Sequence, residues 1–291
     1  MGASFFLAAA ISMAVPSGAP QSPAAEPVSP AAIAVAPVPP DADIERFLRE
    51  AEIVKTKDAS KGVTNSMRAT LSDGKLTHDA HIQTIDESKR EFRSNAGVEF
   101  DFRDSWTYNV AAYKIDRLIG LGMVPVSVSR NHRSTPAAWT WWIDDVLMDE
   151  MDKVKRKVQP PDTGYYSRQR VMMYLFDELI SNIDRNQGNI VYTKDWRLWL
   201  IDHTRAFRKN TALKTPARLT RCDRQVFERL KALDRDTLKR EVGKELDEGQ
   251  IKSVLARRDA IVKKLESLGP SALFDRTAPV LTQNTSGPAA R

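Results

Sequence analysis

The chain of 291 residues contains one cysteine, Cys222, so no disulfide can form within it. It also has no zinc-ligand spacing, no RNA-binding aromatic motif, no long basic arm and no internal repeat. These absences exclude a disulfide-stapled module and a repeat array, and they give no support to a zinc-finger protein. We therefore expect no nucleic-acid partner. Cys222 is predicted to be structural rather than half of a Cys–His nucleophile pair.

Long hydrophobic runs are also missing. The apolar stretch at residues 3–15 is too short for a comfortable membrane span, so we expect no stable transmembrane segment. It is followed by small residues that end at Ala19 and then by a stretch rich in Pro and Ala. This order predicts a signal peptide over 1–19 and a disordered linker over 20–42. A signal peptide in turn predicts export to the periplasm or the extracellular space. No Lys or Arg precedes the apolar stretch, so an upstream start, an atypical signal and the tail of a cytoplasmic protein are the alternatives.

What is present is ordinary for a soluble globular protein, with 42% hydrophobic and 28% charged residues. The length permits one large domain or two small ones and a sizeable core. The net charge of +6 suits an anionic ligand but does not require nucleic acid.

The hydrophobic patterns predict a β-rich first half with one embedded helix, then a mostly helical second half that holds one hairpin. The predicted elements are a helix leading into a strand over 43–55, a hairpin within 61–86, a helix over 104–122 capped by Asp104, strands over 123–130 and 137–148, a charged loop over 149–166, a helix over 167–182 capped by Ser167, a hairpin over 189–202 and helices within 216–268. This order predicts an α+β fold with a β-rich lobe over 43–146, a mainly helical lobe over 147–275 and a loose tail over 276–291.

Two aspartates and an asparagine surround the second hairpin, in NIDRNQGNIVYTKDWRLWLIDHTRAF at residues 182–207. Asn189 follows Asp184 by five residues, and pairing of NIVYT with RLWLID would bring Asn189 and Asp202 to the same end of a ribbon, beside Asp184. Oxygen ligands that converge in this way suit Mg²⁺ (or Mn²⁺) together with the phosphates of a nucleotide. Either aspartate alone is more simply explained as a turn or cap residue, but the combination favours a metal site.

The stretch DRNQGNI…LIDH resembles the DRHxxN…IDFG arrangement of phosphatidylinositol kinases and their atypical bacterial relatives, and its layout is similar to that of HipA-type and secreted Golgi kinases. The upstream NVAAYKIDRLIGLGMVP resembles the helix-then-GLxxVP segment of that superfamily. The resemblance implies a two-lobed protein-kinase-like fold that uses ATP. Carried over by position, it gives Asp184 the catalytic role and makes Asn189 and Asp202 the metal ligands.

The resemblance also implies supporting roles. Arg185 would fix the catalytic loop, and His203 takes the place of the Phe that follows the metal-binding Asp. Arg205 would lie near the γ-phosphate and support the transferred charge. Gly62, in the loop before the first hairpin strand, would lie over the phosphates.

Two positions depart from the pattern of the superfamily. Gln83 stands where relatives place the phosphate-binding Lys, and Asn109 stands where the Glu that pairs with it would fall, so both are assigned to nucleotide binding as neutral amides. The change is a paired one, because loss of a single charge would leave its partner buried and unpaired. Lys61, Arg68 and Lys89 are the candidates to supply the missing positive charge.

The sequence therefore favours a Mg-ATP-dependent phosphotransferase whose acceptor, a protein, a lipid or a small molecule, stays open. The alternatives are a pseudokinase that binds nucleotide or nothing and acts through protein contacts, a nucleotidyl transferase on the same fold, and a helical scaffold without a ligand. Export would favour a donor other than ATP or a pseudokinase, because ATP is scarce outside the cytoplasm, and a disordered tail in place of a signal would favour an ordinary kinase.

Overall fold

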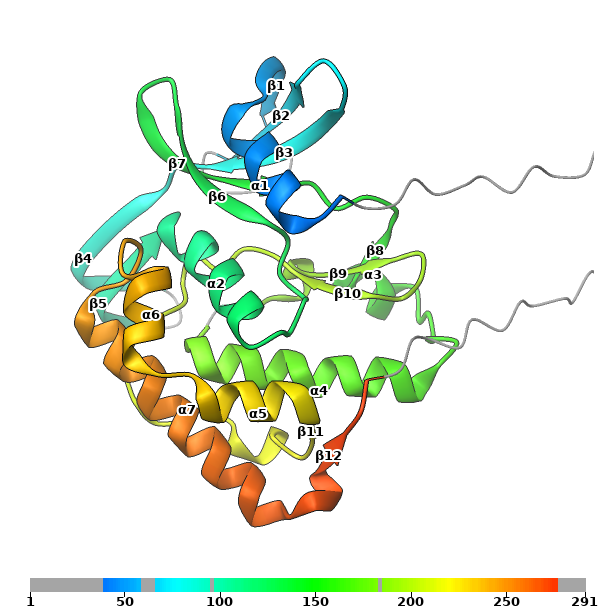
Figure 1. Ribbon diagram of the computed structural model, residues 1–291, viewed down its shortest axis with the longest axis vertical. Coiled ribbons are helices and arrows are strands. Elements are labelled where there is room, and N and C mark those ends of the chain that lie inside the picture. The colour runs from blue at the N-terminus through cyan, green and yellow to red at the C-terminus, as the bar shows by residue number, and fades with distance from the viewer. Residues whose placement is uncertain (1–38, 59–65, 95–96, 183–184, 277–291) are drawn as a thin grey trace, which may run out of the picture. The chain divides into compact units, whose positions relative to one another are not determined.

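A computed structural model describes residues 39–58, 66–94, 97–182 and 185–276 (Figure 1). The first half of this part is built mainly from strands and the second half mainly from helices, as the α+β prediction requires. Of the predicted site residues, Gly62 and Asp184 lie outside the described residues, and so do the predicted signal peptide and nearly all of the linker and tail. None of the described helices is long and apolar enough to cross a membrane.

A five-stranded antiparallel sheet forms the β-rich half. Its strands are β1 (Glu52–Asp58), β2 (Met67–Ser72), β3 (Thr77–Gln83), β7 (Thr135–Trp141) and β6 (Ser127–His132), in that spatial order. The predicted hairpin is confirmed as β2 paired with β3, with Ala69 opposite Ala80. Both alanines are buried, as alternation along a strand requires when one face of a sheet is covered.

Helix α1 (Asp41–Glu50) covers this buried face. Its apolar stripe of Ile44, Phe47 and Leu48 is buried, and the Phe47 ring meets Trp141 of β7 edge-on with 5.8 Å between ring centroids. Helix α2 (Thr107–Leu118) packs against β6 and β7 as well. Because these helices cover one face of the sheet, the opposite face can contact a ligand.

The start of α2 differs from the prediction. The N-cap position is occupied by Trp106, and no side chain caps the helix. Asp104 lies on strand β5, where it is buried, so the prediction that it caps a helix is wrong. Its strand is held by pairing with β4, and this pairing overrides the capping preference of an isolated Asp.

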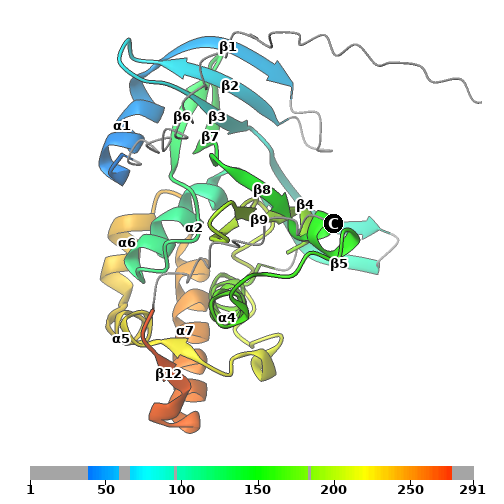
Figure 2. The same cartoon turned by 90° about the vertical axis from the view of Figure 1, so that its right-hand side faces the viewer.

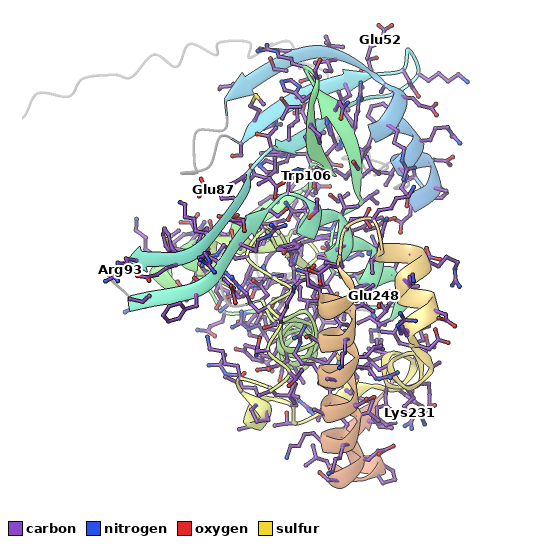
Figure 3. The ribbon with its side chains drawn as sticks, turned by 90° about the vertical axis from the view of Figure 1, so that its left-hand side faces the viewer. Glu52, Glu87, Arg93, Trp106, Lys231 and Glu248 are labelled. Carbon is purple, nitrogen blue, oxygen red and sulfur yellow. The ribbon has the colours of Figure 1, made fainter. Side chains whose placement is uncertain are left out.

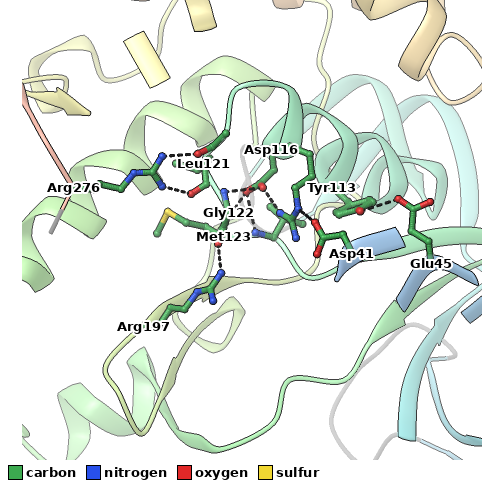
Figure 4. Close-up of polar contacts among 12 residues, drawn as sticks. Asp41, Glu45, Tyr113, Asp116, Leu121, Gly122, Met123, Arg197 and Arg276 are labelled. Carbon is green, nitrogen blue, oxygen red and sulfur yellow. Dashed lines mark hydrogen bonds and ion pairs between the residues drawn. The ribbon is translucent and has the colours of Figure 1, made fainter. Parts of the chain in front are cut away.

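The C-terminal end of α2 is fixed by Asp116. This carboxylate is fully buried and accepts hydrogen bonds from the backbone N–H groups of Gly122, Met123 and Val124, over 2.8 to 3.0 Å (Figure 4). Arg117 also contacts it. Gly120 and Gly122 have positive φ values of 68° and 74°, which suit glycine, so the chain turns sharply here before it enters β6.

Strands β4 (Asp86–Ser94) and β5 (Gly97–Ser105) form a long two-stranded ribbon that the sequence patterns did not predict. Figures 2 and 3 show it extending from the strand-rich half to one side of the molecule, and Figure 3 labels Glu87 and Arg93 on it. Much of its surface is exposed, including Phe100 at 71%. Charged residues on both faces hide the alternation by which half-buried strands are recognised.

A second sheet has the order β10-β9-β8, from β8 (Val146–Asp149), β9 (Ile190–Thr193) and β10 (Leu198–Leu200). The predicted hairpin is confirmed as β9 and β10. The region predicted as a charged loop contains helix α3 (Glu150–Lys155) and the start of α4 (Thr163–Ile180). The cap of α4 is Asp162, not Ser167, because the helix begins four residues before the predicted cap.

Helices α5 (Arg224–Ala232), α6 (Arg235–Val242) and α7 (Glu248–Leu268) fill the predicted helical tail and pack with α4 around one apolar core (Figure 1). Short strands β11 (Cys222–Asp223) and β12 (Leu273–Phe274) pair beside them, and 3₁₀ turns occur at Gln187–Asn189, Pro216–Arg218 and Pro270–Ala272. Cys222 is buried, and its burial raises the pKa of the thiol to about 12, which suits the structural role predicted for it.

Candidate functional site

The candidate site is a cavity of about 490 Å³ between the five-stranded sheet and the three-stranded sheet. Ligand pockets of drug-sized molecules have roughly this volume, on the order of 300 to 1,000 Å³. Four predicted site residues line it together: Gln83, Asn109, Asn189 and Asp202. Gln83 comes from β3 and Asn109 from α2, while the other two residues lie just before β9 and just after β10. Only the tertiary fold brings these segments together.

The β9–β10 hairpin places the two predicted metal ligands. Leu200 pairs with Ile190, and the backbone N–H of Ile201 donates to the carbonyl of Asn189 over 3.2 Å. Asn189 therefore precedes one strand at the point where Asp202 follows the other. The geometry expected from the sequence is present, with both oxygen-bearing side chains at one end of the ribbon and on the cavity wall.

The backbone of Asp202 is in the left-handed region, with φ of 55°. Asp is one of the few residues that adopt this region readily. The Thr204 hydroxyl donates to Oδ1 of Asp202 over 3.0 Å and restrains the carboxylate. The side chain is exposed on the cavity wall, so a cation and a phosphate can reach it.

Arg185 links the open end of the β9–β10 hairpin to helix α4. Its guanidinium donates to the carbonyl of Ile201 over 2.8 Å and to that of Asn189 over 3.2 Å, and it pairs with Asp177 of α4 over 2.9 Å. Only 8% of the side chain is exposed. The expectation that Arg185 fixes this loop therefore agrees with its contacts, since it bonds to the backbone of Asn189 and to that of Ile201, the residue before Asp202.

His203 fills a buried position behind Asp202. It is 1% exposed, and its ring meets Phe176 edge-on with 6.0 Å between centroids. Burial, assisted by the nearby Arg185, holds the pKa of His203 well below its ordinary value, so the ring is neutral and packs as an apolar side chain would. This explains how a histidine can occupy the place of the superfamily's Phe.

Asn109 and Gln83 both line the cavity and are both buried. The side-chain carbonyl of Asn109 accepts a hydrogen bond from the backbone N–H of His203 over 2.8 Å. Asn109 therefore has a contact of its own to the segment that carries Asp202. From the sequence, Asn109 was identified only as the residue that replaces the Glu expected to pair with a Lys at position 83.

The lining of the cavity contains no Lys or Arg among the described residues. Arg68 pairs with Asp79 and Lys89 pairs with Glu87, and neither lines the cavity. Lys61 lies outside the described residues. Two of the three candidates for the missing positive charge are therefore elsewhere.

Arg205 also lies away from the cavity wall. Its guanidinium pairs with Glu99 over 2.5 Å and lies over the Phe102 ring, 4.4 Å from the centroid. Both partners belong to the β4–β5 ribbon. In this structure Arg205 connects the segment after Asp202 to the ribbon, and its predicted contact with the γ-phosphate stays a prediction.

Several polar residues near the site were not found from the sequence, and two of them, Asp149 and Asp152, add carboxylates to the cavity lining. His81 lines the cavity from β3, two residues before Gln83, and burial lowers its pKa against the opposing charge of Asp202. Asp104 lies near Thr204 and Asp202, and burial raises its pKa. The period of two along β3 could have identified His81, whereas Asp104 depends on the unpredicted ribbon.

The donor set fits a hard divalent cation. Asp202 offers a carboxylate and Asn189 an amide oxygen on one wall, and Mg²⁺ or Mn²⁺ is usually held by one or two carboxylates with substrate phosphates and water. The described residues contain no group of three His, Cys, Asp or Glu side chains that could hold a metal alone. Water and the phosphates of a nucleotide could supply further ligands to a metal at this site.

No family model matches the chain, and no curated protein matches it. Its fold is nevertheless shared by solved structures. The hydra Fam20 structure with sugar has a TM-score of 0.59 and 16% identity, and the match covers 80% of this chain and 91% of that chain. The Golgi casein kinase with Mn/ADP bound has a TM-score of 0.58 and 13% identity, with 79% and 76% covered.

At these identities the likeness establishes the fold. The chain has an atypical kinase-like fold, with a β-sheet N-terminal region and a helical C-terminal region. The resemblance drawn from residues 184–207 predicted this fold correctly.

Proposed function

We propose that the protein is a phosphotransferase that binds ATP with Mg²⁺ or Mn²⁺ in the cavity between the two sheets. Asn189 and Asp202 would bind the metal, and Asp184 would orient and deprotonate the acceptor hydroxyl. The observation that carries the proposal is the placement of Asn189 and Asp202 on one cavity wall, with Arg185 bonded to the carbonyls of Asn189 and Ile201. The Golgi casein kinase with the same fold is known with Mn/ADP bound, which supports a nucleotide and a divalent metal here.

The metal would supply the positive charge that stabilises the phosphates. The chain's own residues hold the nucleotide and keep the metal ligands in place. Asn109 and Arg185 each bond to the backbone beside a ligand, and Gln83 lines the cavity from β3. Gly62 would contact the phosphates from the loop before β2, and Arg205 would act from the segment after Asp202.

A pseudokinase is the second candidate, and one observation favours it. No Lys or Arg lines the described part of the cavity, so the phosphates would depend on the metal for neutralisation. In this case the nucleotide would bind, but transfer would be slow or absent. The protein would then act through contacts with a partner.

Two further assignments are part of the proposal. The lobes are assigned to residues 43–146 and 147–275, and the protein is assigned to an exported location through a signal peptide over residues 1–19. The acceptor, a protein, a lipid or a small molecule, stays open.

Thermal unfolding of the full chain tests the nucleotide site. With millimolar ATP we expect a rise in Tm that requires Mg²⁺ or Mn²⁺ and is lost in Asp202→Asn. Asp259→Asn is the matched control, because Asp259 is exposed and its ion pair within the described part of the chain is with its neighbour Arg258. The absence of any shift, or a shift that survives in Asp202→Asn, would overturn the metal–nucleotide site.

Release of ADP from ATP separates the two candidates. Metal-dependent ADP formation that is lost in Asp184→Asn supports the phosphotransferase. A metal-dependent rise in Tm without ADP formation, across protein, lipid and sugar acceptors, supports the pseudokinase.

A further inference from the structure

A groove of about 640 Å³ lies between the β4–β5 ribbon and residues 206–210, the segment that follows Asp202. We call it the ribbon groove. Among the described residues, none lines both this groove and the nucleotide cavity, so the two are separate surfaces. They are neighbours along the chain, because His203 lines the nucleotide cavity and Ala206 lines the ribbon groove.

The floor of the ribbon groove, residues 206–210, is held by three side chains of helix α7. They contact four successive backbone carbonyls: the Gln250 amide contacts that of Phe207 over 3.1 Å, the Ser253 hydroxyl that of Lys209 over 2.9 Å, and the Arg257 guanidinium those of Arg208, over 2.9 Å, and Asn210. The three donors are spaced as neighbours on one face of a helix. The floor is therefore fixed before a partner binds, and binding need not pay the entropy of ordering it.

Most charged side chains of the groove lining are already paired. The pairs are Arg208 with Glu99, Lys209 with Asp247 and Lys89 with Glu87. Arg90 and Arg103 are the exceptions, because both are exposed and neither forms an ion pair within the described part of the chain. Asp101, the remaining carboxylate of the lining, pairs with neither of them. Two guanidinium groups against one carboxylate leave an excess of positive charge for an anionic partner.

Phe100 adds an apolar surface to the same groove. Its side chain is 71% exposed, the highest value among the large apolar side chains of the described residues. A single exposed apolar residue is ordinary on a protein surface. An aromatic ring beside unpaired arginines is different, because aromatic residues and arginine are the residue types enriched where proteins bind each other.

We propose that the ribbon groove binds an acidic, extended segment of a protein partner, with carboxylates on Arg90 and Arg103 and an apolar side chain against Phe100. Guanidinium groups bind carboxylates through two parallel N–H bonds, which gives direction as well as attraction. An extended segment suits a groove whose wall is a ribbon of two strands, each nine residues long. The interaction does not depend on phosphotransfer, although a partner held here would lie beside the segment that carries Asp202.

Fluorescence anisotropy of a labelled peptide tests the proposal with the full chain, in the absence of nucleotide and metal. The probe consists of repeated Glu-Glu-Phe units. We expect saturable binding that weakens with added salt. Peptides of Gln-Gln-Phe and of Glu-Glu-Ser units should each bind about tenfold more weakly, because the first lacks the carboxylates and the second lacks the apolar side chain.

Substitutions in the groove should act on the same measurement. Arg90→Gln and Arg103→Gln should each weaken binding of the Glu-Glu-Phe peptide about three- to tenfold, and Phe100→Ser about tenfold. Arg93→Gln is the matched control, because Arg93 is an exposed arginine of the same ribbon that pairs with Glu91 and lies outside the groove lining. Arg103→Glu should shift the preference toward a Lys-Lys-Phe peptide, a change that partial unfolding does not produce.

The proposal is overturned if the Glu-Glu-Phe and Gln-Gln-Phe peptides bind equally, or if all three groove variants bind the first peptide like the wild type. Heparin tests an anionic polysaccharide as the partner. Heparin binding that exceeds peptide binding and depends on Arg90 and Arg103 but not on Phe100 would replace the protein partner with a polysaccharide.

Asp202→Asn separates the ribbon groove from the nucleotide cavity and should bind the peptide like the wild type. Loss of peptide binding in Asp202→Asn would place the peptide in the nucleotide cavity and overturn the proposal. Because the measurement uses neither ATP nor metal, its outcome is independent of whether the protein is a phosphotransferase.

Discussion

The side-chain carbonyl of Asn109 accepts a hydrogen bond from the backbone N–H of His203 over 2.8 Å, so helix α2 is joined directly to the segment that carries Asp202. The bond is buried, and its two residues lie 94 positions apart in the chain. It couples the position of α2 to that of the proposed metal ligand. A neutral amide can make this contact, whereas a carboxylate that has lost its lysine partner would be buried with an unpaired charge.

Removal of this acceptor should affect both stability and nucleotide binding. Asn109→Leu leaves the buried N–H of His203 without its partner, which we expect to lower the free energy of unfolding by about 1–3 kcal/mol. The metal-dependent rise in Tm with ATP should also shrink, because Asp202 loses a restraint. Asn109→Gln keeps a neutral acceptor and should recover part of the stability in urea denaturation. Wild-type stability and ATP response in Asn109→Leu would show that the bond has no such role.

A positive charge at position 83 should strengthen the contact with phosphates. Gln83 is 3% exposed and lines the cavity. In Gln83→Lys we expect ATP affinity to rise about tenfold or more, since a charge-assisted contact replaces a neutral one. Adenosine has no phosphates and serves as the control ligand in the same titration. Equal gains for ATP and adenosine would place position 83 away from the phosphates, and the variant without ligand should be less stable because its new charge is buried.

The Asp79 carboxylate should make the β2–β3 hairpin sensitive to acid. It accepts hydrogen bonds from Thr70 over 2.6 Å and from Arg68 over 2.7 Å. Partial burial acts to raise its pKa, but the bonds from Thr70 and Arg68 outweigh burial and hold the pKa below its ordinary value of 3.8. A lowered pKa in the folded state means that this stabilisation is present above the ordinary pKa and is lost as the pH falls through the folded value.

The free energies of unfolding of the wild type and of Asp79→Asn, measured by urea denaturation, should therefore differ by a constant amount above about pH 5. The two values should converge in more acidic solution. Asp73→Asn is a useful comparison, because the pKa of Asp73 is lowered mainly by backbone N–H groups of its own turn and only weakly by the charge of Lys75. Added salt should reduce the effect at Asp79 more than the effect at Asp73. A difference for Asp79→Asn that does not change with pH would refute its titration as the cause.

Several parts of the fold could be read from the sequence because their signals are local. The hairpin of β9 and β10 was visible from two short apolar runs across a tight turn, and that of β2 and β3 from alternation around an Asp-Gly turn. Helix α2 was visible from its broad apolar face. From the first hairpin alone it followed that Asn189 and Asp202 share one end of a ribbon.

Other parts depended on contacts that local patterns do not report. The β4–β5 ribbon is largely charged and exposed, so its strands are stabilised by pairing with each other rather than by an apolar face. The first turns of α4 were missed because Asp162 caps it before the apolar stripe begins. The strand predicted over 137–148 is divided between β7 of the five-stranded sheet and β8, which pairs with β9 in the second sheet.

The sequence by itself determined that the chain has no internal disulfide, that an asparagine and an aspartate meet at a hairpin end, and that neutral amides occupy positions 83 and 109. These features follow from residue identity and from periods of two and 3.6 residues, which act over a few neighbours. Only the tertiary structure decided that Asn109 bonds to His203 and that Arg205 forms an ion pair with Glu99. It also decided that three arginines distant in the chain, Arg168, Arg197 and Arg276, line one cavity. Such contacts join residues as far as 106 positions apart, as in Arg205 and Glu99, and their partners are selected by the packing of whole helices and sheets.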